Sequence, residues 1–174
     1  MCDCHNEAVA WAWVRPADPS ILDSRPLLDL GTGDGQTLAT LVRHAGLIVG
    51  VDRSPEILAV GRPAVFPVVS AEAVALPFAA GTFETVLAGD LFHHLDETAL
   101  EEVLTEVRRV LRPGGRLVAW WYEAPGREAP DAPRFPRPYG VVASAASAFV
   151  AVDRLALVMT LEPAPPTVGL VAKR

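Results

Sequence analysis

Leu27-Leu28-Asp29-Leu30-Gly31-Thr32-Gly33-Asp34-Gly35-Gln36-Thr37-Leu38 joins a short apolar run to three glycines at alternate positions. Apolar side chains then recur at helical spacing over residues 38–45. This pattern predicts a strand, a tight turn and a helix, the first half of a βαβ unit. Glycines in such a turn accept positive φ and let the backbone approach a ligand, which also meets free N–H groups at the helix start.

A second apolar run, residues 47–51, predicts a parallel strand with Asp52 at its carboxyl end. Asp52 follows Gly33 at about the 20-residue spacing of a carboxylate that accepts the hydroxyls of a ribose. Ligands of parallel α/β sheets bind outside the carboxyl ends of the strands. The sequence therefore predicts an adenosine-type ligand.

The glycine spacing limits which adenosine ligand is expected. A dinucleotide fingerprint places a third glycine where this chain has Gln36. A nicotinamide-dependent oxidoreductase is thereby disfavoured, and no hydride-site pattern supports it.

Four segments in a fixed order carry a family resemblance: residues 28–35, 49–56, 71–78 with 83–87, and 109–118. Together they resemble the class I S-adenosylmethionine-dependent methyltransferases, in the small-molecule branch typified by ubiquinone-biosynthesis enzymes (methyltransferase type 11). The resemblance implies an α/β fold with a Rossmann-like, mostly parallel sheet, an antiparallel C-terminal hairpin strand and helices on both faces. It also implies transfer of a methyl group from S-adenosyl-L-methionine to a small-molecule acceptor. A non-catalytic module that only binds the cofactor remains an alternative.

The resemblance implies a set of cofactor-binding residues. They are Asp29, Gly31, Thr32, Gly33, Asp52, Arg53, Ser70, Ala71, Glu72 and Gly89. Gly31 and Gly33 are expected to cradle the methionine portion, and Asp29 to hold its ammonium group. Asp52 is expected at the ribose and Arg53 beside the adenine. Ser70 stands where relatives usually carry an aspartate that contacts the adenine amino group.

The loop after the strand expected at 85–88 holds the candidate catalytic residues Asp90, His93 and His94. A histidine near neutral pKa is able to remove a proton from an attacking oxygen or nitrogen. The alternative is that the two histidines only position the loop and the next helix.

Composition narrows the class of partner. The chain has 174 residues and a net charge of −6, which argues against a nucleic-acid substrate. No apolar run reaches the roughly 20 residues that span a bilayer, and the start has no signal pattern, so we expect a cytoplasmic protein without a membrane partner. Cys2, Cys4 and His5 do not complete a tetrahedral site, so no metal is expected.

We expect one domain over residues 1–174, with an N-terminal arm at 1–26 and a proline-rich loop at 123–140. The arm carries Trp11 and Trp13, and the loop carries Phe135 and Tyr139, with Arg137 nearby. These aromatic side chains either pack on the sheet or cover the pocket as a lid. A second subunit, in a homodimer, is the other way to cover it.

The remaining patterns predict secondary structure. Helices are expected at 55–61, 97–110 and 141–150, and further strands at 65–69, 85–88, 117–121, 155–161 and 168–172. Asp96 is the expected N-cap of the long helix. The acidic residues of that helix are expected on a solvated face; they are Glu97, Glu101, Glu102 and Glu106.

Overall fold

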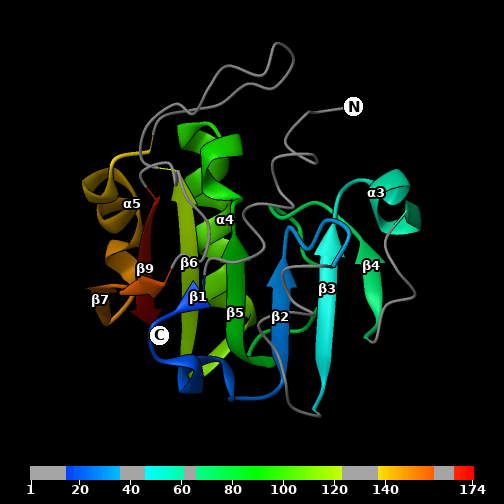
Figure 1. Cartoon of the computed structure of the whole chain (residues 1–174), viewed down its shortest axis with the longest axis horizontal. Coiled ribbons are helices and arrows are strands. Elements are labelled where there is room, and N and C mark those ends of the chain that lie inside the picture. Colours follow the sequence, from blue (N-terminus) through cyan, green and yellow to red (C-terminus); the bar gives the residue numbers. More distant parts are fainter. Residues whose placement is uncertain (1–14, 36–45, 61–65, 123–136, 159–166) are drawn as a thin grey trace.

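The computed structural model describes residues 15–35, 46–60, 66–122, 137–158 and 167–174, and its centre is a seven-stranded sheet (Figure 1). Across the sheet the strands are β4 (Val68–Ser70), β3 (Ile48–Asp52), β2 (Leu27–Leu30), β5 (Phe83–Gly89), β6 (Leu111–Tyr122), β9 (Thr167–Lys173) and β7 (Ala151–Arg154). The first five are parallel, and β9 is antiparallel to both of its neighbours. This confirms the predicted mostly parallel sheet with an antiparallel strand. The loops after β2, β3 and β5 consequently leave the sheet at one edge, the upper edge in Figure 1.

β2 shows why the central strands form. All four of its residues are buried, as expected of a parallel strand that is covered on both faces. Leu28 and Leu30 join the core on one face, whereas Leu27 joins the core on the other. Asp29 alternates with Leu28 and therefore points to the same face as Leu27.

One face is covered by α4 (Glu97–Val110), α5 (Tyr139–Ala145) and the 3-10 helix η3 (Ala146–Ala148). Asp96 caps α4, because its Oδ1 accepts a hydrogen bond of 2.8 Å from Ala99 N. The stripe that α4 buries consists of Leu100, Val103, Leu104, Val107 and Val110. Each such side chain contributes about 1.5–3 kcal/mol when it leaves water, so packing dominates the stability of this helix.

The other face carries a smaller core around Trp120, with Leu22 from the 3-10 helix η1 (Pro19–Leu22) packed on it. The described helices therefore lie on both faces, η1 here and α4 with α5 opposite. Two short strands, β1 (Arg15–Pro16) and β8 (Leu157–Val158), pair in a separate two-stranded sheet. The helix predicted at 38–45 lies outside the described residues, as do most of the N-terminal arm and most of the proline-rich loop.

The predicted C-terminal hairpin is correct in β9 but wrong in its partner. The strand expected at 155–161 lies earlier, as β7 at Ala151–Arg154. Leu155 follows β7 and still donates its backbone N–H to Gly169 O at 2.8 Å. Its side chain packs against Gly169, where an added Cβ would lie 3.1 Å from Leu155 Cβ. Leu155 is therefore buried in the smaller core, and β8 continues toward β1 instead of toward β9.

Element boundaries also differ. The helix expected at 141–150 begins at Tyr139 after the N-cap Pro138 and ends at Ala145, with η3 beyond it. The proline-rich loop is consequently shorter than predicted at its C-terminal end, and Arg137 is 5% exposed rather than part of an open flap. The helix α3 (Pro55–Val60) and strands β4 and β5 lie at the predicted places, with ends shifted by a few residues. Strand β6 contains the predicted residues 117–121 but begins earlier, at Leu111.

The solvated acidic face predicted for α4 is wrong at Glu106. Its side chain is 17% exposed, and Oε2 accepts a hydrogen bond of 2.8 Å from Leu76 N. Arg109 donates to Glu106 and also to the carbonyls of Leu76 and Phe78. The two residues therefore fasten the segment between β4 and β5 to the helix, which sequence periodicity does not show.

Candidate functional site

The turn after β2 is held against β3 by backbone hydrogen bonds. Gly31 N and Thr32 N both donate to Val51 O, at 2.8 and 2.9 Å. The φ angles of Gly31, Gly33 and Gly35 are +76°, +55° and +77°. Side chains are rarely tolerated in this left-handed region, so the three alternate glycines are required by the shape of the turn.

Asp52, at the carboxyl end of β3, joins this turn to the loop that follows it. Its Oδ2 accepts a hydrogen bond of 3.0 Å from Gly33 N, and its Oδ1 accepts one of 2.9 Å from Ser54 N. Ser54 in turn caps α3, since its hydroxyl accepts from Ile57 N at 3.3 Å. An ionised carboxylate has about four acceptor positions, so Asp52 keeps capacity for two further donors.

Asp29 is the buried acid of the site. It is 4% exposed, and its Oδ2 has no hydrogen-bond partner among the described residues. Burial raises the pKa of Asp29 to about 7, with a smaller contribution from the nearby Asp52 carboxylate, while the Thr32 side chain acts in the opposite direction. A buried, unpaired carboxyl group is unusual in a folded protein and is typical of a functional site. Its chemistry suits a cationic partner.

Thr32 and Gly50 make a contact that sequence analysis missed. The Thr32 side chain is buried above Gly50, where an added Cβ would lie 2.9 Å from both Cγ2 and Oγ1 of Thr32. Thr32 therefore helps to pack the turn onto β3. A glycine inside a strand is the sequence signal for such a close approach.

The other residues predicted to contact the adenine also lie at the edge of the sheet that carries Asp52. Ser70 lies beside Asp52 in the β3–β4 pairing, and Ala71 N donates to Asp52 O at 3.0 Å. Arg53, Ser70 and Glu72 are exposed.

The loop after β5 meets the turn after β2. A Cβ added at Gly31 would lie 3.3 Å from Leu91 Cδ1, so the two loops touch. Between Leu91 and β5, Asp90 has a φ of +54°, and its backbone N donates to Trp120 O at 2.9 Å. Burial raises the pKa of Asp90 to about 7, while the Trp120 side chain acts in the opposite direction. Trp120 was predicted only as part of a strand.

His93 and His94 lie in the 3-10 helix η2 (Phe92–His94). His93 is 4% exposed and His94 is exposed, with their ring centroids 4.1 Å apart. Within the described ranges, no group of three or more His, Cys, Asp or Glu is arranged to hold a metal ion, and Cys2, Cys4 and His5 lie outside those ranges.

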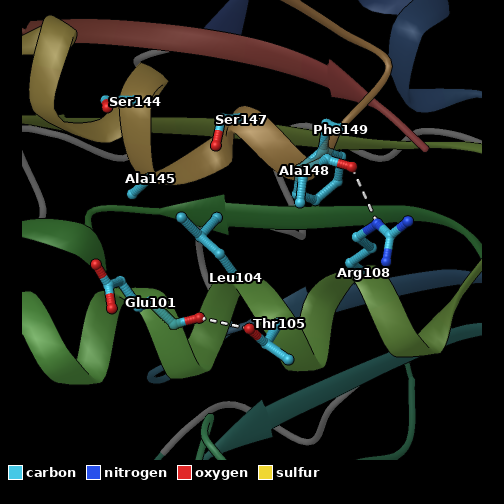
Figure 2. Close-up of a pocket in the computed structure, with 9 residues that line it drawn as sticks. All are labelled: Glu101, Leu104, Thr105, Arg108, Ser144, Ala145, Ser147, Ala148 and Phe149. Atoms are coloured by element: carbon cyan, nitrogen blue, oxygen red, sulfur yellow. Dashed lines mark hydrogen bonds between the residues drawn. The ribbon is translucent and has the colours of Figure 1, made fainter.

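A groove of about 320 Å³ lies elsewhere, between α4 and the α5–η3 segment (Figure 2). Its lining is formed by Glu101, Leu104, Thr105, Arg108, Ser144, Ala145, Ser147, Ala148 and Phe149. Arg108 Nε donates to Ala148 O at 3.0 Å, and Thr105 Oγ1 donates to Glu101 O at 2.9 Å. None of the predicted site residues lines it, so the groove is a seam of helix packing rather than the candidate site.

Comparison with known proteins identifies the family. Residues 28–119 match the model of the methyltransferase domain family, and the chain belongs to that family. The match begins in β2 and ends in β6, so it contains the turn after β2, Asp52 and the loop after β5.

Two curated relatives are demethylmenaquinone methyltransferases. One, from Corynebacterium kroppenstedtii, is 34% identical over 114 residues, which are 64% of this chain and 49% of that protein. The other, from Thermus thermophilus, is 35% identical over 127 residues, 67% of this chain and 57% of that protein. The chain thus spans about half the length of these curated relatives.

A solved structure with the same fold is an S-adenosylmethionine-dependent methyltransferase from Mesorhizobium loti. It is 18% identical with a TM-score of 0.68, and the alignment covers 90% of this chain and 96% of that one.

Proposed function

We propose that this chain is an S-adenosylmethionine-dependent methyltransferase that acts on a small molecule. The observation that carries the proposal is the Asp52 carboxylate, fixed by Gly33 N at 3.0 Å and Ser54 N at 2.9 Å beside the glycine turn. This arrangement leaves acceptor capacity for a pair of ribose hydroxyls at the carboxyl ends of two parallel strands.

The residues present fit the cofactor. The Asp29 carboxyl is buried, its Oδ2 has no partner among the described residues, and its charge would match the ammonium group of the methionine portion. Gly31 and Gly33 hold the turn in a conformation that brings backbone N–H groups to the edge of the sheet. Thr32 packs this turn onto β3.

The adenine would lie beyond Asp52, on the side of β4. Ser70, Ala71 and Glu72 follow one another there, and Arg53 extends from the end of β3. Ser70 offers a neutral hydroxyl in place of the carboxylate usual in relatives, so its contact with an amino group is weaker.

When bound, S-adenosylmethionine supplies a methyl group that its positive sulfur already activates. The chain therefore chiefly has to position an acceptor in line with that group. Asp90, His93 and His94 are the candidate catalytic residues, and Gly89 brings the loop to the site. The contact of Leu91 with Gly31, in the turn after β2, supports this assignment.

Further proposals concern partners and location. The net charge of −6 supports a small-molecule acceptor, and two cysteines in 174 residues suit a reducing cytoplasm. No helix in the described parts of the chain has the length and apolar composition needed to cross a membrane. Our proposal for covering the site is the N-terminal arm (1–26) together with the proline-rich loop (123–140), or a second subunit of a homodimer.

Titration calorimetry on the whole chain tests the proposal. S-adenosylmethionine and S-adenosylhomocysteine should bind with Kd values in the micromolar range, on the order of −8 kcal/mol, and NAD should not bind. Binding of NAD alone would overturn the proposal. Binding of S-adenosylhomocysteine without transfer to any acceptor would favour the binding module instead.

A further inference from the structure

Trp120 occupies an unusual place at the carboxyl end of β6. It is fully buried and lies across from Gly89 in β5 and Gly169 in β9. A Cβ added at Gly89 would lie 2.5 Å from Trp120 Cζ2 and 3.1 Å from its Nε1. The N–H edge of the indole therefore lies over Gly89, next to Asp90.

The indole N–H of Trp120 has no hydrogen bond of good geometry to the described residues. Its neighbour Trp121 is equally buried, yet Trp121 Nε1 donates to Arg137 O at 2.6 Å. Buried tryptophan N–H groups normally find such a partner. The Trp120 side chain lowers the pKa of Asp90, as a donor facing the ionised carboxylate does.

Asp90 is held by its backbone in a sparsely populated conformation. Its φ is +54°, and its N–H donates to Trp120 O at 2.9 Å. Aspartate tolerates this region better than most residues, but such positions concentrate at functional sites. Unlike Trp120, Asp90 is partly exposed, so it is the member of the pair that a ligand can reach.

We propose that Asp90 takes the proton from a hydroxyl group of the methyl acceptor, and that Trp120 is the positioning residue that holds the Asp90 carboxylate for this step. The inference rests on the proposed function and deepens it, because it names the acceptor class: a molecule methylated on a hydroxyl oxygen. Gly89 is required for this arrangement, because any side chain at position 89 would displace the indole of Trp120.

The pair fits a hydroxyl better than other nucleophiles. A neutral hydroxyl is a weak nucleophile until its proton is removed, whereas a neutral amine attacks first and releases its proton afterwards. In the step, the acceptor O–H bond breaks and its proton passes to Asp90. The oxygen forms a C–O bond to the methyl carbon as the C–S bond of the donor breaks and its electron pair stays on sulfur. The products are a methyl ether, neutral S-adenosylhomocysteine and protonated Asp90.

The first test needs no acceptor and no cofactor. The chain has four tryptophans, so the indole N–H resonance of Trp120 is assignable by NMR with Trp120→Phe. In the wild-type chain this resonance should move with pH, with a midpoint near the pKa of about 7 that burial gives Asp90. Other titratable side chains at this edge include Asp29, Asp34, Asp52, Glu72, His93 and His94. Asp90→Asn separates their titration from that of Asp90. A resonance that does not move, or that still moves in Asp90→Asn, would overturn the proposal.

The second test uses matched phenols, anilines and thiophenols with radiolabelled S-adenosylmethionine. Methyl ethers should form, and Trp120→Phe should lower kcat by about tenfold or more with KM little changed and the acidic limb of the pH profile shifted upward. The control Trp121→Phe, which removes an indole N–H from the opposite face, should keep kcat within about twofold.

Transfer only to amines or thiols, or no transfer to any phenol by a chain that binds S-adenosylhomocysteine, would overturn the hydroxyl assignment. Equal losses in Trp120→Phe and Trp121→Phe would overturn the positioning role. If the wild-type chain does not bind S-adenosylhomocysteine, the proposed function itself is contradicted.

Discussion

The carboxyl ends of β2 and β3 differ in kind from those of β5 and β6. At β2 and β3 the backbone supplies most of the polar groups, and Asp52 satisfies Gly33 N and Ser54 N before any ligand arrives. At β5 and β6 the polar groups are side chains, with Asp90 in a left-handed conformation and Trp120 Nε1 without a hydrogen bond of good geometry to any described residue. We infer that the carboxyl ends of β2 and β3, the binding end, hold the cofactor. The carboxyl ends of β5 and β6, the reacting end, carry the groups that act on the acceptor.

Asp29 tests this division most strongly, because it is a buried carboxyl group at the carboxyl end of β2 whose Oδ2 has no hydrogen-bond partner among the described residues. Its pKa is raised to about 7 by burial, so the unfolded chain loses this proton first as pH rises from about 4. The free energy of unfolding of the wild-type chain should therefore fall between about pH 4 and pH 7 and then level off. Asp90, whose pKa burial also raises to about 7, contributes a similar fall, so Asp29→Asn should remove only the share due to Asp29. The variant should be more stable than the wild-type chain at pH 8 by up to about 4 kcal/mol, with no gain near pH 4.

Denaturant unfolding of both chains at pH 4 and pH 8 measures the effect on stability. The affinity of Asp29→Asn for S-adenosylhomocysteine should also fall, because the ammonium group of the ligand loses its charged partner. A gain that is equal at pH 4 and pH 8 would show that burial of the ionised carboxyl is not its cause.

Gly89→Ala tests the reacting end. An added Cβ would lie 2.5 Å from the Trp120 ring, so the variant should lose about 1–3 kcal/mol of unfolding free energy through overpacking. The control Gly140→Ala, in α5, meets nothing within 4 Å and should be neutral or slightly stabilising. Equal unfolding free energies for the two variants would mean that the indole moves aside freely.

Ser70→Asp should have the smallest effect. It adds a carboxylate beside Asp52 at the position where relatives usually carry one, and a charge-assisted contact with the adenine should tighten S-adenosylhomocysteine binding by about 1 kcal/mol. Calorimetry measures the change. Weaker S-adenosylhomocysteine binding by a folded Ser70→Asp variant would show that Ser70 does not contact the adenine.

The binding end was predictable from the sequence because its signals are local. Alternate glycines predict the turn, an apolar run ending in Asp52 predicts β3, and Ser54 and Asp96 cap α3 and α4 as expected. Each of these signals depends on residues a few positions apart, where conformational preference decides the structure.

The reacting end was predicted only in part, because its contacts join distant strands. Asp90 was a candidate from its place after β5, but Trp120 was not, since the Gly89–Trp120 pairing depends on the register between β5 and β6. Glu106 was misplaced for the same reason, as its partner Leu76 lies 30 residues away. The β7 error has the same origin, because Leu157 and Val158 pair with the distant β1 rather than with β9.

The most direct measurement of the central claim is the affinity of Asp52→Ala for S-adenosylhomocysteine, compared with Asp18→Ala. Both aspartates accept a hydrogen bond from a backbone N–H, but Asp18 does so from Ser20 N on the exposed η1 turn. Asp52→Ala should raise the Kd at least about tenfold, equivalent to roughly 1.4 kcal/mol, while Asp18→Ala leaves it unchanged. An unchanged Kd in a folded Asp52→Ala variant would contradict the assignment of the cofactor site to β2 and β3.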